Sequence, residues 1–160
     1  MDKQNKKLVI NVGIAVIAYF GVVKPILQKL GVMKTKEEKA KENARQKAID
    51  DEKKAVAKSG QSPTKSDAEW IAIVEQIYQD IRYSAIDDNK ADAAYQLQRA
   101  KNNADVILMV DLFGMRREYW FGIPAGDEKD LFSMVRYNLS STQINTVNNN
   151  WQRKNIKYRI

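Results

Sequence analysis

An uncharged apolar run, LVINVGIAVIAYFGVV, occupies residues 8–23 and constrains this chain more than any other feature. Lys6 and Lys7 precede it, and Lys24 and Lys29 follow it. A helix that crosses a membrane needs about 20 apolar residues, and lysines at its ends can extend their charged groups to the lipid head groups. The run therefore predicts a single transmembrane helix near the N-terminus. Its membrane-spanning positions are Leu8, Val9, Ile10, Val12, Ile14, Val16, Ile17, Tyr19, Phe20, Val22 and Val23.

Two other interpretations of the run stay open. A cleaved signal peptide would end in an A-x-A-like site, whereas the sequence here continues Val22-Val23-Lys24-Pro25. A buried core helix would not be expected to carry lysine clusters at both ends. The predicted localisation is therefore a single-pass membrane protein, in the internal membrane of a virion or in a bacterial inner membrane.

The excess of positive charge lies beside this run. The chain has 27 basic and 20 acidic residues, yet residues 61–160 contain thirteen of each. The net charge of +7 therefore falls entirely within residues 1–60. A basic segment next to a membrane helix favours anionic lipid head groups as a partner. A nucleic-acid-binding domain would concentrate positive charge on its folded body, so nucleic acid is not an expected partner.

The sequence contains no cysteine and no histidine. Disulfides, thiolate nucleophiles, the usual zinc sites and histidine-based catalytic triads are therefore all excluded. No motif in the sequence indicates a particular catalytic reaction. We accordingly expect a protein without enzymatic activity, catalytic residues, metal or cofactor.

Changes in composition divide the chain into three parts: a membrane anchor (1–33), a charged helical spacer (34–65) and a C-terminal helical domain (66–160). The spacer is rich in Lys, Glu and Ala and has no Gly or Pro between residues 34 and 58, which favours a helix. A disordered charged tether is the alternative. The expected fold class is all-α: one transmembrane helix, the spacer helix and a small bundle of about five short helices.

Helix-capping signals mark the helices of the C-terminal domain. Ser66 with Glu69, and Ser140 with Gln143, have the spacing of capping boxes. Asn89 and Asn102 are placed to begin two further helices, and Gly114 to end the second of these. A fourth helix is expected to start near residues 127–128. Residues 116–126 are expected to form an irregular connection, and 156–160 a short edge strand.

A basic and aromatic cluster lies in this connection and is the candidate partner interface. Exposed aromatic residues and arginines frequently form the strongest contacts of protein interfaces. The alternative is that Trp120 and Phe121 fold inward and fill the core. The candidate interface residues are Arg116, Arg117, Tyr119, Trp120 and Phe121.

The order of short helices over residues 67–160 resembles one annexin-like helical repeat, and it also looks like modules in structural proteins of phages that infect Bacteroidetes. The segments that carry the resemblance are Asp87-Asp88-Asn89, Ala104-Asp105-Val106, Asp111-Leu112-Phe113-Gly114, Asp130-Leu131 and Asn138-Leu139-Ser140. Annexin repeats bind calcium through a glycine-rich first loop and a downstream carboxylate, here Asp127 or Glu128. The first loop of this chain, residues 85–89, has no glycine, so calcium binding is not expected.

These features together predict a membrane-anchored structural protein, a virion component that tethers an internal membrane to capsid or vertex proteins through its C-terminal helical domain. One alternative is a phage lysis protein that bridges the cell envelope, similar to a spanin, or another single-pass envelope protein. Another is a membrane-bound enzyme or peptidoglycan-binding module.

Overall fold

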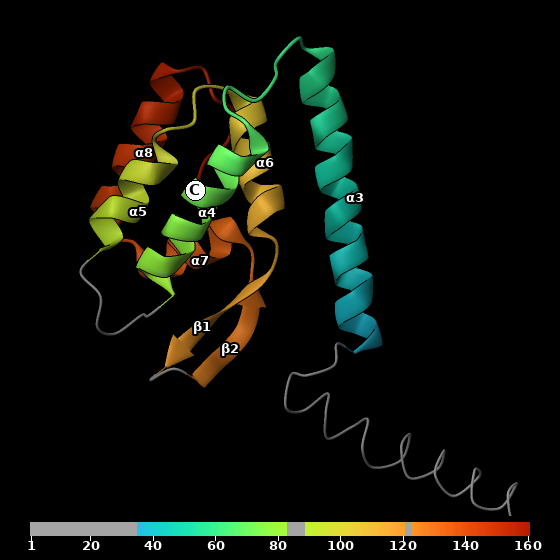
Figure 1. The fold of residues 1–160 in the computed structure, drawn as a ribbon, viewed down its shortest axis with the longest axis vertical. Helices are drawn as coiled ribbons and strands as arrows, with labels where there is room; N and C mark the ends of the chain where they lie inside the picture. The colour runs from blue at the N-terminus through green and yellow to red at the C-terminus, as the bar shows by residue number, and fades with distance from the viewer. Residues whose placement is uncertain (1–34, 83–88, 121–122) are drawn as a thin grey trace, which may run out of the picture. The chain divides into compact units, whose positions relative to one another are not determined.

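The computed structural model describes residues 35–82, 89–120 and 123–160. The chain divides into two compact units, Met1–Arg45 and Gln46–Ile160. The described elements are α3 (Lys36–Lys58), α4 (Asp67–Ile81), α5 (Lys90–Leu97), α6 (Asn103–Phe113), β1 (Arg116–Trp120), β2 (Ile123–Lys129), α7 (Leu131–Asn138) and α8 (Ser141–Arg153) (Figure 1).

The predicted all-α class is wrong, because residues 116–129 contain an antiparallel pair of strands. The pair places Glu118 opposite Ala125 and Tyr119 opposite Pro124, with a register irregularity between Arg116 and Glu118. The sequence of β2, IPAGDEK, is poor in strand-forming residues, which is why an irregular connection was expected. A two-stranded sheet has an unpaired edge on each strand, and such an edge tolerates a proline.

The predicted transmembrane helix and membrane localisation are also corrected. Within residues 35–82, 89–120 and 123–160, no helix is long and apolar enough to span a bilayer. The longest of the described helices, α3, has a strongly polar sequence. The predicted span, residues 8–23, lies outside the described residues.

Helix α4 occupies the centre of the helical core of the second unit. It contacts α5, α6 and α7, while α5 also contacts α8 (Figure 1). The apolar face of this helix is buried in the core, with Trp70, Val74, Ile77 and Ile81 almost wholly inaccessible. The largest fully buried side chains of the other elements are Leu97, Met109, Phe113, Leu131, Met134, Trp151 and Ile156.

Both predicted capping boxes are confirmed. The hydroxyl of Ser66 accepts a hydrogen bond from the Glu69 amide, and the Glu69 carboxylate accepts one from the Ser66 amide at 3.0 Å. Ser140 and Gln143 make the same reciprocal pair at the start of α8. These local bonds fix where α4 and α8 begin, and therefore where the residues beside their ends lie.

The C-terminal half of α3 is attached to the rest of the second unit by buried and polar contacts. Ile49 and Val56 lie about two helical turns apart on the same face and are only 4% and 5% exposed. Lys53 forms an ion pair with Asp111 of α6 at 2.5 Å. The Glu52 carboxylate accepts hydrogen bonds from Tyr158 and Lys157. The tail that was expected to form an edge strand, residues 156–160, has no strand structure.

Candidate anion-binding pocket

The predicted partner-interface residue Arg116 is partly buried and makes several contacts within the domain. Its guanidinium donates to both carboxylate oxygens of Glu75, at 2.9 and 2.5 Å, and to the Phe113 backbone oxygen at 2.8 Å. Its central carbon lies 4.6 Å from the ring centroid of Tyr78 and 5.0 Å from that of Phe113. The ion pair lowers the pKa of the Glu75 carboxyl. Arg116 therefore joins β1 to α4 and α6.

The other residues of the predicted interface are only partly placed. Arg117 is paired with Glu128 across the hairpin at 4.0 Å. The Tyr119 amide donates to the Arg82 backbone oxygen at 2.8 Å, which fixes β1 at the end of α4. The Trp120 backbone belongs to β1, whereas its side chain and all of Phe121 lie outside what the structure describes. Contact of these residues with a partner stays a prediction.

A pocket of about 510 Å³ lies at a different place, where α5 ends beside α8. Its lining combines four cationic side chains with two amides and one tyrosine. The lining residues are Lys65, Tyr95, Gln98, Arg99, Lys101, Asn150 and Lys154. No carboxylate occurs among the described residues of this lining. We call this site the basic pocket.

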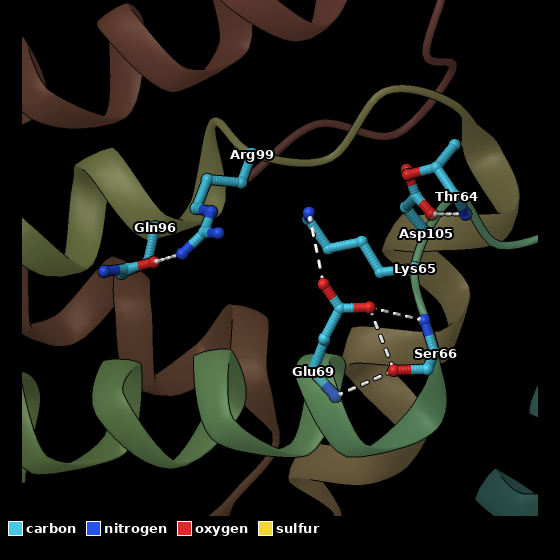
Figure 2. Close-up of polar contacts among 7 residues, drawn as sticks. All are labelled: Thr64, Lys65, Ser66, Glu69, Gln96, Arg99 and Asp105. Carbon is cyan, nitrogen blue, oxygen red and sulfur yellow. Dashed lines mark hydrogen bonds and ion pairs between the residues drawn. The ribbon is translucent and has the colours of Figure 1, made fainter.

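Asp105 organises one side of the basic pocket. It is fully buried near the N-terminus of α6 and accepts hydrogen bonds from the amide and hydroxyl of Thr64, at 2.7 and 2.9 Å. It also accepts one from the Lys101 amide at 2.8 Å. A single carboxylate thus binds the segment before α4 to the α5–α6 loop. These bonds connect the segments that carry Lys65 and Lys101, and Figure 2 shows the Thr64–Asp105 contact next to Lys65.

Lys154 lines another part of the basic pocket. Its ammonium donates to the backbone oxygens of Gln98 and Ala100, at 2.6 and 2.9 Å, just beyond the C-terminus of α5. Burial lowers the pKa of Lys154, and the nearby charges of Lys101 and Arg153 lower it further, while Asp105 opposes this shift. Lys154 is therefore a partly buried cation with two other cations and one carboxylate nearby.

Two of the four cations, Arg99 and Lys65, also contact residues outside the lining. Arg99 donates to the side-chain oxygen of Gln96 at 3.0 Å, and Lys65 lies 3.8 Å from the Glu69 carboxylate (Figure 2). The pKa of Glu69 is lowered mainly by its hydrogen bonds with Ser66, with smaller contributions from Lys65 and Arg99. Glu69 therefore balances part of the charge of Lys65 from outside the pocket lining.

Three of the lining residues are uncharged: Tyr95, Gln98 and Asn150. Tyr95, on α5, is 65% exposed. Asn150 of α8 has a buried side-chain oxygen, Oδ1, for which the described residues offer no hydrogen-bond donor. This oxygen has less than 1 Å² of accessible surface, so a ligand in the pocket does not reach it in this conformation.

The arrangement is suited to binding anions. Arginine and lysine form charge-assisted hydrogen bonds with phosphate and carboxylate groups, and several of them around one space favour a ligand with several negative charges. None of the residues of the basic pocket was predicted from the sequence. Its cations come from three separate segments of the chain, and residues 61–160 have no net charge, so no run of basic residues marks the site.

The described residues contain no group of three or more acidic side chains that could hold a metal ion. The loop in which the annexin resemblance would place calcium, residues 85–89, lies almost wholly outside them. No protein-family model, curated protein or solved structure matches this chain. The resemblance to an annexin repeat therefore stays a prediction. The function of this chain is inferred from the geometry of the basic pocket.

Proposed function

We propose that the Gln46–Ile160 unit is a binding module rather than an enzyme, and that its ligand is a multiply charged anion held in the basic pocket. One observation carries this proposal. Cations from the segment before α4, from the α5–α6 loop and from the end of α8 meet around a single pocket whose described lining has no carboxylate.

Electrostatics supports an anion with more than one charge. Bringing like charges together raises the free energy of the folded state, and a bound anion relieves that repulsion. One carboxylate would offset only part of four positive charges, whereas a chain of phosphates could offset most of them.

The residue types of the pocket favour binding over catalysis. Its described lining has no carboxylate, and the sequence has no histidine or cysteine, so the usual general acids and bases are missing there. The structural role predicted from the sequence, in which this domain docks on capsid or vertex proteins, stays a prediction. In such docking, the basic pocket would bind an anionic group on the partner protein.

The proposal is tested by isothermal titration calorimetry of the full chain with sodium tripolyphosphate. Binding is expected for the wild type, weakening as salt is raised because added ions screen the attraction. Arg99→Gln is expected to weaken binding about tenfold, the equivalent of ~1.4 kcal/mol for a lost charge-assisted hydrogen bond.

The matched control is Arg136→Gln, an exposed arginine on α7 that does not line the pocket. It removes the same charge and should leave the affinity unchanged. Equal weakening by the two variants would show a diffuse attraction without a site, and absence of tripolyphosphate binding would refute the proposal outright.

A further inference from the structure

We propose that the C-terminal half of α3, residues 46–58, is a strap that opens as a unit while the core stays folded, and that its opening uncovers a second apolar face of α6. This inference goes beyond the anion-binding function and does not depend on it. It follows from three features of the strap: a small apolar contact of its own, ion pairs that solvent reaches, and a glycine at the point where the chain turns.

The apolar residues at the strap are separate from the main core. Among the residues that the structure describes, four buried apolar side chains do not belong to the core cluster shared by the other helices. Two of them, Ile49 and Val56, lie on α3, and two, Ala104 and Ile107, lie on α6. Stabilisation by burial is proportional to the apolar area removed from water, so four side chains contribute much less than the main core.

Hydrogen bonds at both ends fix the register of the strap against α6. Gln46 and Lys53 donate to the Asp111 carboxylate at 3.0 and 2.5 Å, and the Asn103 amide donates to the side-chain oxygen of Gln61 at 3.0 Å. Each apolar residue of the strap lies three positions after one of the two donors, and those of α6 lie four and seven positions before Asp111. Residues with these spacings share a helical face, so the four apolar side chains face one another.

Solvent reaches the ion pairs that hold the strap. Lys53, paired with Asp111, keeps 38% of its side-chain surface exposed, and Lys157, paired with Glu52, keeps 54%. Ion pairs with this much exposure contribute little stability, and dissolved salt screens them. The closed strap is therefore held weakly, and more weakly as the salt concentration rises.

Gly60 provides the hinge. Its φ of 78° lies in the left-handed region that glycine adopts readily, and a side chain at this position would meet no other atom within 4 Å. From Gln61 onward the chain is bound to α6, through the Asn103 amide and through the two bonds between Thr64 and Asp105. The strap can therefore move about Gly60 while the segment that follows stays in place.

Opening of the strap changes what α6 presents to solvent. Ala104 and Ile107 are 4% and 8% exposed when the strap is closed, and opening makes them accessible beside the Asp111 carboxylate. The basic pocket stays intact, because Asp105 and the carbonyls beyond α5 hold its walls. The strap thus controls access to this face of α6 without altering the pocket.

Hydrogen–deuterium exchange of the full chain, measured by mass spectrometry on peptides from the strap and from α4, tests the proposal. Strap amides should exchange faster than those of α4, and with a weaker dependence on low urea concentrations, because opening exposes less surface than global unfolding does. Raising sodium chloride from about 0.05 M to about 0.5 M should speed strap exchange further.

One substitution made at two places separates the strap from the core. Val56→Ala should speed strap exchange about tenfold by weakening the apolar contact, although alanine would stabilise a free helix. Val147→Ala makes the same change in the main core, on α8. It should speed exchange in α4 and leave strap exchange within about twofold, because the core is folded whether the strap is open or closed.

A second pair of variants tests the polar contacts. Lys53→Met keeps the length of the side chain and removes its charge, so strap exchange should rise about threefold. Lys54→Met is the matched control, since Lys54 is 73% exposed and its ion pair is with Asp51 of the same helix. It should leave strap exchange unchanged.

Two results would overturn the proposal. Equal acceleration of strap and α4 exchange by Val147→Ala would show that the strap unfolds only together with the core. Slower strap exchange in Val56→Ala would show that this half of α3 is a free helix. If Val147→Ala does not fold, an equal urea dependence of strap and α4 exchange in the wild type decides against the strap. These outcomes do not involve tripolyphosphate, so they leave the anion-binding function standing.

Discussion

The indole nitrogen of Trp151 donates a hydrogen bond to the backbone oxygen of Leu97 at 3.0 Å, and both side chains are fully buried. This bond joins the last residue of α5 to α8, within the core. The residues that follow Leu97 and the residues beside Trp151 supply five of the seven side chains that line the basic pocket. The position of the pocket walls is therefore determined by core packing.

Replacing Trp151 by phenylalanine should destabilise the protein by about 1–3 kcal/mol. The substitution leaves the Leu97 carbonyl without its buried donor and removes part of a well-packed ring. Urea unfolding followed by circular dichroism measures the change. A midpoint equal to that of the wild type would show that the hydrogen bond is not formed in solution.

Arg116→Lys should lower the free energy of unfolding by about 1–3 kcal/mol. Lysine keeps the charge but cannot reproduce the two-oxygen contact with Glu75 together with the bond to the Phe113 carbonyl. Arg117→Lys is the matched control, because its pair with Glu128 at 4.0 Å is a peripheral contact, worth about 0–1 kcal/mol. Equal stabilities for the two variants would show that these contacts of Arg116 do not stabilise the fold, which would leave its side chain available to a partner.

Glu52→Gln should remove an acid-sensitive part of the stability. Hydrogen bonds from Lys157 and then Tyr158 lower the pKa of Glu52 below its ordinary value of 4.5. A carboxyl with a lowered pKa stabilises the folded state above its unfolded pKa, and that stabilisation is lost as the pH falls through the folded value. The wild type should thus exceed the variant by about 1 kcal/mol at neutral pH, with the difference vanishing in acid.

Urea midpoints measured from pH 7 down to pH 3 follow this difference. Asp51→Asn, an exposed acid on the same helix, serves as control and should leave the pH profile parallel to that of the wild type. A constant gap between wild type and Glu52→Gln across the range would contradict the assigned ion pair.

Ser140→Ala should destabilise the protein by about 1 kcal/mol, the usual effect of losing an N-cap side chain. The neighbouring Ser141→Ala alters the first residue of α8 and leaves the capping box intact, so it should have little effect. Thermal unfolding of the two variants gives the comparison. Destabilisation by Ser141→Ala and not by Ser140→Ala would move the start of the helix by one residue.

Local signals in the sequence located most of the helical structure. The Ser66–Glu69 and Ser140–Gln143 pairs are reciprocal bonds within four residues, so their spacing alone predicts them. The hairpin was missed because its strand β2 contains Pro124 and Gly126, and only pairing with β1 makes it extended. Such pairing is a tertiary effect that no local pattern carries.

The candidate site was missed for a related reason. Lys65 and Lys154 are separated by almost the whole domain, and they meet because buried Asp105 and the carbonyls beyond α5 hold their segments together. The contacts of Arg116 could not be predicted from the sequence either. Its partners Glu75, Tyr78 and Phe113 lie on α4 and α6, far from it in the chain, and its part in a partner interface stays a prediction.

The two carbonyl bonds of Lys154 have a consequence for how tightly the pocket can hold a ligand. A lysine side chain without other contacts loses much of its conformational entropy when it binds an anion. Lys154 has already lost that freedom in folding, because the oxygens of Gln98 and Ala100 fix its ammonium at the pocket wall. Its share of the binding free energy is therefore not reduced by an ordering penalty, and a ligand meets a charge that is preorganised.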